Sequence, residues 1–162
     1  MSGRVSAAPA RHLLVVYQSR SGGTQALADA TIAGASSDEI DDVDVRVLRA
    51  FDAAADDVRW CDGLLLGTPE NFGYMSGAVK DFFERIYYDL LEETRGLPYA
   101  LFVKGGHDGE GAVRSIERIA TGLAWRAALP PVVVVGDIDD AALERCHELG
   151  LTFAAGLEAG VF

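Results

Sequence analysis

Short apolar runs of strand length alternate five times with segments of helical periodicity along this chain. The runs fall at residues 12–17, 43–47, 62–68, 99–103 and 132–135. This alternation is typical of βαβ units and predicts an α/β fold with a parallel sheet. Helices cover both faces of such a sheet, so its inner strands read as continuous apolar runs, as residues 12–17 do. Residues 43–47 instead alternate apolar and polar side chains, and we expect them to form a half-exposed edge strand.

Size, charge and cysteine content limit the class of protein. At 162 residues the chain has the size of one domain, and we expect residues 12–162 to form it after a disordered tail at 1–11. Its 14 Lys and Arg against 25 Asp and Glu give a net charge of −11, which disfavours binding to nucleic acid or an anionic membrane. This acidity suits either docking onto basic protein partners or solubility.

The sequence also predicts a cytoplasmic protein. Cys61 and Cys146 have no CxxC spacing, so neither a disulfide framework nor a zinc site is expected. No apolar run approaches the roughly 20 residues that span a bilayer. A reduced compartment and no membrane association follow from these two observations.

A hydroxyl- and glycine-rich turn follows the first apolar run. Ser19, Ser21 and Thr24 supply hydroxyl groups, and Gly22 and Gly23 let the backbone pass close to a ligand. A helix is expected to begin near Gly23, and the N-H groups at its N-terminus attract anions such as a phosphate monoester. A plain strand-to-helix turn remains the alternative. The turn matches neither the GxxxxGK[ST] nor the GxGxxG pattern.

Two further loops of unusual composition, at residues 69–76 and 104–111, follow the third and fourth apolar runs. The second of these loops has glycine at four of its eight positions. Right-handed crossovers bring the carboxyl ends of parallel strands to one edge of a sheet, so we expect all three loops to meet there.

These loops carry a family resemblance. Residues 17–24, YQSRSGGT, resemble the FMN phosphate loop of flavodoxin-like proteins, which reads [ST]-x-[ST]-G-x-T. Residues 62–85, DGLLLGTPENFGYMSGAVKDFFER, resemble NAD(P)H-dependent FMN reductases and the related NAD(P)H:quinone oxidoreductases. In those proteins a Gly/Ser-x-Pro turn precedes an aromatic-Gly-x-Met-Ser stretch and a Lys-x-Phe-x-x-Arg helix. The resemblance implies a three-layer flavodoxin-like fold, with a five-stranded parallel sheet in order 2-1-3-4-5 and helices on both faces.

The resemblance also implies an FMN site built from the three loops. The residues it implies are Ser19, Arg20, Ser21, Gly22, Gly23 and Thr24 at the phosphate, Thr68, Pro69, Glu70, Asn71, Phe72, Gly73 and Tyr74 around the isoalloxazine ring, and Gly105, Gly106, His107 and Asp108 at its pyrimidine side. Glu70 and Asn71 replace the small or apolar residue and the aromatic residue that are usual after the proline.

Several roles within this site stay open at the sequence level. Phe72 and Tyr74 either contact the ring or pack against the neighbouring helix, whereas Phe82 and Phe83 are expected in the core. His107 either hydrogen-bonds a reduced, anionic flavin or is an exposed loop residue. No catalytic side chain and no metal site are expected, because the flavin itself carries the redox chemistry.

The predicted function is an oxidoreductase that uses NADPH or NADH to reduce a flavin or quinone, a small-molecule electron acceptor. A flavodoxin-type electron carrier with a redox protein partner is the main alternative, and an interaction module that binds no flavin is the third. The resemblance implies a homo-oligomer. A receiver domain is excluded because Gln18-Ser19 and Thr68 stand where its acids would be, and a serine hydrolase because no G-x-S-x-G elbow is present.

Overall fold

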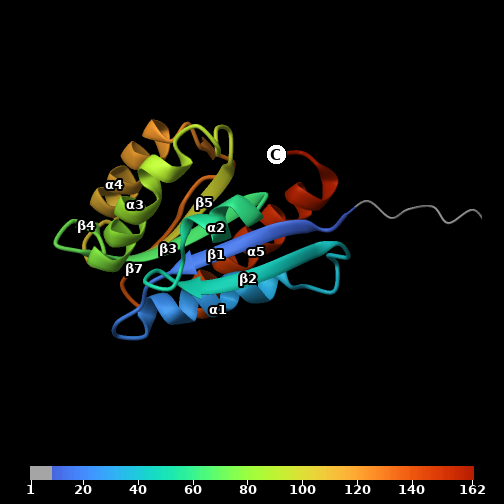
Figure 1. The fold of residues 1–162 in the computed structure, drawn as a ribbon. Coiled ribbons are helices and arrows are strands. Elements are labelled where there is room, and N and C mark those ends of the chain that lie inside the picture. Colours follow the sequence, from blue (N-terminus) through green and yellow to red (C-terminus); the bar gives the residue numbers. More distant parts are fainter. Residues whose placement is uncertain (1–8) are drawn as a thin grey trace, which may run out of the picture.

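The computed structural model describes residues 9–162 and consists of one sheet between two layers of helices (Figure 1). The elements, in chain order, are β1 (Arg11–Tyr17), α1 (Gly23–Ala35), β2 (Val43–Arg49), α2 (Ala55–Trp60), β3 (Gly63–Asn71), β4 (Tyr74–Met75), α3 (Gly77–Leu90), β5 (Pro98–Gly105), α4 (Glu110–Gly122), β6 (Arg126–Ala127), β7 (Val132–Val135) and α5 (Asp140–Ala159).

The predicted strand order is confirmed. The strands lie in the order β2-β1-β3-β5, and the short strands β6 and β7 both pair with the outer edge of β5. All of these pairings are parallel. The five predicted strands therefore correspond to β1, β2, β3, β5 and β7, and the two-residue strands β4 and β6 are additions to them.

Burial follows the position of each strand in the sheet. Residues 13–17 of β1 are buried, as a central strand covered on both faces requires. In β2 no residue is fully buried, and this strand lies at the edge of the sheet, as its alternating sequence predicts. The pattern of apolar residues therefore indicates which segments are strands and whether each lies at the centre or the edge of the sheet.

Each face of the sheet has its own hydrophobic core. On one face α1 and α5 cover β1, β3 and β5 through side chains that include Leu27, Phe102 and Phe153. On the other face α2, α3 and α4 pack through side chains that include Phe82 and Ile116. Phe82 and Phe83 are 0% and 1% exposed, so their predicted place in the core is confirmed.

Helices α1 and α5 approach each other unusually closely. A Cβ atom placed on Gly34 of α1 would lie 1.9 Å from the carbonyl oxygen of His147, and one on Gly150 of α5 would lie 1.9 Å from that of Thr31. Only glycine fits at these two positions, since the backbones themselves are in contact.

The expected long loop at residues 69–76 is wrong as a description of this segment. Strand β3 continues to Asn71 and turns back through Phe72 and Gly73 into β4, which pairs with it antiparallel. Both turn residues have positive φ, 53° at Phe72 and 68° at Gly73, as a two-residue type I′ hairpin turn requires. We call residues 70–75 the β3–β4 hairpin.

Two other boundaries differ from the expectation. Lys104 and Gly105 belong to β5, and Glu110 and Gly111 to α4, so the expected loop at 104–111 is reduced to residues 106–109. Arg11, expected in the tail, begins β1 and pairs with Val43, while residues 1–8 lie outside the described part of the chain. Within residues 9–162, no helix is both long and apolar enough to cross a bilayer.

Candidate functional site

The three loops meet at the carboxyl edge of the sheet, which points to the left in Figure 1. A Cβ atom on Gly23, in the first loop, would lie 3.4 Å from Cγ of Lys104 at the end of β5. Glu70 of the β3–β4 hairpin accepts hydrogen bonds from backbone N-H groups of residues 107 and 109. The structure thus brings the first loop to β5 and the second loop to the third.

The first loop presents free N-H groups at the beginning of α1. Gly22 is the N-cap, with a φ of 94°, and no side-chain hydrogen bond from it caps the helix. The N-H groups of Gln25 and Ala26 are bonded to Ser19 Oγ and the Gly22 carbonyl oxygen, whereas none of the described residues accepts from those of Gly23 and Thr24. Two free donors at the positive end of a helix suit an oxyanion.

The side chains of this loop divide into two groups. Ser19 and Thr24 are 8% and 2% exposed, and the Ser19 hydroxyl serves the loop itself by capping Gln25. Arg20, Ser21 and Gly22 are exposed. The loop is therefore a backbone cradle with a buried base, formed by Ser19 and Thr24, and an exposed rim.

Arg49, at the end of β2, holds the loop from the neighbouring strand. Its Nη2 donates to the Ser19 carbonyl oxygen at 2.5 Å, and its Nη1 donates to Gln25 Oε1 at 3.3 Å. Its guanidinium lies 5.0 Å from the centroid of the Tyr17 ring, and its buried Nε has no partner within residues 9–162. Arg49 is not among the residues predicted for the site, since only the β1–β2 pairing brings it to the loop.

Lys104 is a second cation that the sequence analysis missed. Side chains alternate along β5, and Ala100 and Phe102 belong to the core beneath α1 and α5, so Lys104 points to the same side. Its stem packs against Gly23, and its Nζ has one long hydrogen bond, 3.3 Å, to the Gly105 carbonyl oxygen. An ammonium group has three donors, so two of them are available to a ligand beside the α1 N-terminus.

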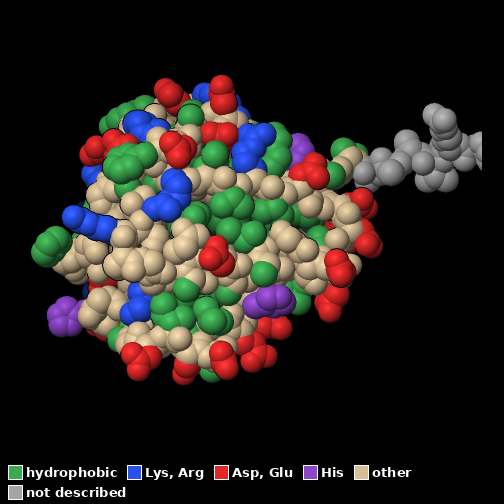
Figure 2. Space-filling view, turned by 90° about the horizontal axis from the view of Figure 1, so that it is seen from below, with side chains coloured by type: hydrophobic (Ala, Val, Ile, Leu, Met, Phe, Trp, Pro, Cys, Tyr) green, Lys and Arg blue, Asp and Glu red, His purple; other side chains and the backbone are tan. Residues whose placement is uncertain are grey.

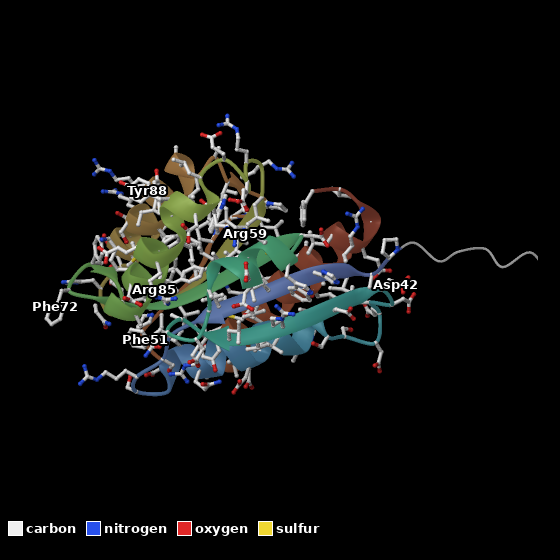
Figure 3. All side chains as sticks on the ribbon, viewed as in Figure 1. Asp42, Phe51, Arg59, Phe72, Arg85 and Tyr88 are labelled. Carbon is white, nitrogen blue, oxygen red and sulfur yellow. The ribbon has the colours of Figure 1, made fainter. Side chains whose placement is uncertain are left out.

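The second loop contributes backbone groups and two exposed aromatic side chains, Phe72 and Tyr74. Thr68 is fully buried, and its hydroxyl accepts from the Ser76 N-H and donates to the Pro69 carbonyl oxygen, so its side chain is occupied within the protein. Phe72 is fully exposed at the hairpin tip and projects at the left of Figure 3. Packing of Phe72 against the neighbouring helix is therefore excluded, while Tyr74 is 41% exposed.

A pocket of about 370 Å³ lies between the hairpin and the third loop. Its walls are formed by residues from these two segments: Glu70, Phe72, Gly73, Gly106 and His107. His107 and Asp108 are exposed, and Gly105 lies in β5, where it pairs with Val135. We call residues 105–109 the glycine loop. Phe72 and the two glycines give the pocket apolar and backbone surface, and Glu70 and His107 give it polar groups. No lysine or arginine is among these wall residues, which suits an uncharged polar ring.

No described group in this region has the arrangement of a nucleophile or a metal centre. Within residues 9–162 no cluster of three His, Cys, Asp or Glu side chains could hold a metal ion. Burial raises the pKa of the Cys61 thiol to about 12, and the pKa of the Cys146 thiol is raised as well, so both thiols stay protonated at neutral pH.

An anion cradle, a pocket at the same edge of the sheet and a parallel sheet in the observed order together define a flavodoxin-like protein. Residues 37–139 match the family described as NADPH-dependent FMN reductase. The chain belongs to this family. The matched segment contains the hairpin and the glycine loop but not the first loop.

Individual relatives agree with the fold. The chain is 35% identical over 99 residues to a protein of Aquifex aeolicus named flavodoxin, a match that spans 61% of this chain and 52% of that protein. A flavodoxin from the domain Archaea superposes with a TM-score of 0.77 at 24% identity, covering 90% of this chain and 98% of the other. Two-electron reduced Megasphaera elsdenii flavodoxin superposes with a TM-score of 0.71 at 26% identity, covering 88% of this chain and 98% of the other.

Proposed function

We propose that the protein binds FMN non-covalently and uses NADPH or NADH to reduce a flavin or quinone acceptor. The observation that carries this proposal is that the anion cradle at the beginning of α1 and a pocket of about 370 Å³ lie at the same edge of the sheet. The free N-H groups of Gly23 and Thr24, with Lys104 beside them, would hold the phosphate. The hairpin and the glycine loop would enclose the ring.

The flavin supplies the hydride and electron chemistry when bound, and the protein orients it and excludes competing reactions. The open side of the pocket supports a reductase. Its only aromatic wall residue, Phe72, projects into solvent, so within the described residues no aromatic side chain closes the pocket to a nicotinamide or quinone. The family match supports the same reaction class.

An electron-carrier function is the second candidate, favoured by the acidic surface and by the flavodoxin relatives. Figure 2 shows acidic side chains along the lower and right-hand rim of the face it presents. A carrier would use such a rim to dock a basic redox partner and would not oxidise NAD(P)H.

Steady-state oxidation of NADPH and of NADH, with added FMN and a benzoquinone, separates the two functions. A reductase gives acceptor-dependent turnover with at least one nucleotide. Flavin-loaded protein that is inert to both nucleotides would leave the carrier function, and protein that takes up no FMN would refute both. Absorbance of the purified, FMN-incubated and desalted protein near 450 nm reports the binding step independently.

A further inference from the structure

A buried carboxylate joins the two walls of the pocket. Glu70 lies on β3 opposite Met75 of β4 and is 7% exposed. Its Oε1 accepts a hydrogen bond of 2.6 Å from the His107 N-H and one of 3.1 Å from the Gly109 N-H. No hydrogen bond to its Oε2 is found within residues 9–162. One side chain of the hairpin therefore holds the backbone of the glycine loop, 37 residues further along the chain.

The position of these two N-H groups explains why an acidic side chain stands there. Gly109 is the N-cap of α4, has a φ of 78° and has no side chain with which to cap the helix. Asp108 caps only the Glu110 N-H, at 3.0 Å. Glu70 supplies the missing acceptor from another element, and the positive end of α4 stabilises its carboxylate.

Backbone contacts reinforce this link. A Cβ atom on Gly106 would lie 3.0 Å from the Glu70 carbonyl oxygen, and one on Gly111 would lie 1.9 Å from that of Gly73. The hairpin and the beginning of α4 thus touch without intervening side chains. The separation of the two pocket walls depends on these contacts and on Glu70.

We propose that Glu70 is a positioning residue that fixes the spacing of the two pocket walls, and that its charge opposes reduction of a ring bound between them. This inference rests on the proposed function for the identity of the ring. Glu70 itself lines the pocket, so its negative charge acts on the bound ring over a short distance. Reduction that adds negative charge to the ring is then disfavoured.

Two substitutions separate the two roles. In Glu70→Gln the amide oxygen can still accept both N-H groups, but the charge is gone. We expect an FMN dissociation constant within about twofold of wild type and a midpoint potential shifted upward, because the opposing charge is removed. In Glu70→Ala both hydrogen bonds are lost, and we expect the FMN dissociation constant to rise at least about tenfold.

Glu110→Gln is the matched charge control. Glu110 lies at the start of α4 with its side chain 63% exposed and 3.2 Å from Arg114. Because an exposed, paired carboxylate is screened, its removal should shift the midpoint potential much less than Glu70→Gln does. An equal shift in the two variants would overturn the specific role of the Glu70 charge, as would an unchanged potential in Glu70→Gln.

Amide hydrogen exchange in the apoprotein tests the positioning role without any flavin. We expect exchange at His107 and Gly109 to be faster in Glu70→Ala and close to wild type in Glu70→Gln. Unchanged exchange in Glu70→Ala would overturn the positioning role. If Glu70→Ala does not fold, Glu70→Asp, whose carboxylate is one methylene short of the N-H groups, takes its place.

The two proposals fail in different ways. Absence of FMN binding in the wild-type protein would refute the proposed function and, with it, the effect of the charge on the ring. Faster exchange at Gly109 in Glu70→Ala would still establish the link between the walls. FMN binding with normal turnover and an unshifted potential in Glu70→Gln would refute the electrostatic role alone.

Discussion

Two basic residues, Arg20 and Lys104, lie where they could pair with a bound phosphate. Arg20, within the phosphate-loop motif, is exposed and has no hydrogen-bond partner among the described residues. Lys104 lies with its stem against Gly23, beside the free N-H groups of α1. The structure therefore favours Lys104 as the cation that would pair with a phosphate.

We expect Lys104→Met to raise the FMN dissociation constant about tenfold and to leave riboflavin binding unchanged. Methionine keeps the apolar stem on Gly23 and removes one charge-assisted hydrogen bond to the phosphate. Fluorescence titrations with both flavins measure the difference. Arg20→Ala is the matched control and should stay within about twofold for both ligands.

Two results would contradict this assignment. Equal losses for FMN and riboflavin in Lys104→Met would mean that Lys104 acts through the fold of the loop. A phosphate-specific loss in Arg20→Ala, with none in Lys104→Met, would make Arg20 the cation.

At the scale of the element, the β3–β4 hairpin contains a strained residue. Phe72 adopts a φ of 53°, a conformation that asparagine and glycine accept far more readily, and its side chain is fully exposed (Figure 3). An exposed phenylalanine in this conformation reduces stability and gains nothing from packing. This is the pattern expected where a side chain is kept for a ligand.

Phe72→Asn should therefore raise the free energy of unfolding by about 1 kcal/mol, measured by urea denaturation of the apoprotein. Phe51→Asn is the control, because Phe51 is 64% exposed in another loop without a positive φ. It should change stability by no more than about 0.5 kcal/mol. A loss of stability in Phe72→Asn would show that the phenyl ring makes a stabilising contact.

The close contact between α1 and α5 predicts that a larger side chain at Gly34 reduces stability. Gly34→Ala places a methyl group 1.9 Å from the His147 carbonyl oxygen, so the two helices must separate. We expect a loss of about 2 kcal/mol or more in unfolding free energy. Gly77→Ala, at the first residue of α3 with open space around it, should be neutral or slightly stabilising. Chemical denaturation of both variants makes the comparison.

Similar losses in Gly34→Ala and Gly77→Ala would contradict close packing at Gly34 and point to a general effect of replacing glycine. An FMN affinity that falls in Gly34→Ala alone would connect this helix pair with the cradle at the beginning of α1.

Across the whole molecule, the features predictable from sequence are those carried by local pattern. Continuous and alternating apolar runs indicate the central and edge strands β1 and β2. Serine before a helical pattern is a usual N-cap, and Ser76 caps α3 by accepting from the Val79 N-H. The chain order of the loops places them at one edge of the sheet. Each of these predictions depends on residues that are close together in the sequence.

Features that depend on contacts between residues far apart in the sequence could not be predicted from it. Glu70 reads as an unusual residue beside a proline, and only its bonds to His107 and Gly109 reveal a link between two loops. Arg49 lies two residues beyond the expected edge strand at 43–47, and only the register of β1 and β2 places it beside Tyr17. The hairpin turn was missed because its first residue is phenylalanine, which sequence statistics do not associate with positive φ.

The close pairing of α1 with α5 has a consequence for the order of events during synthesis. The cradle stands at the beginning of α1, whose only helical neighbour on that face of the sheet, among the described residues, is α5, more than a hundred residues later in the chain. A nascent chain on the ribosome has made every loop of the site before it makes the helix that presses α1 onto the sheet. The ability to retain a phosphate-bearing ligand should therefore be acquired late, once α5 has left the exit tunnel.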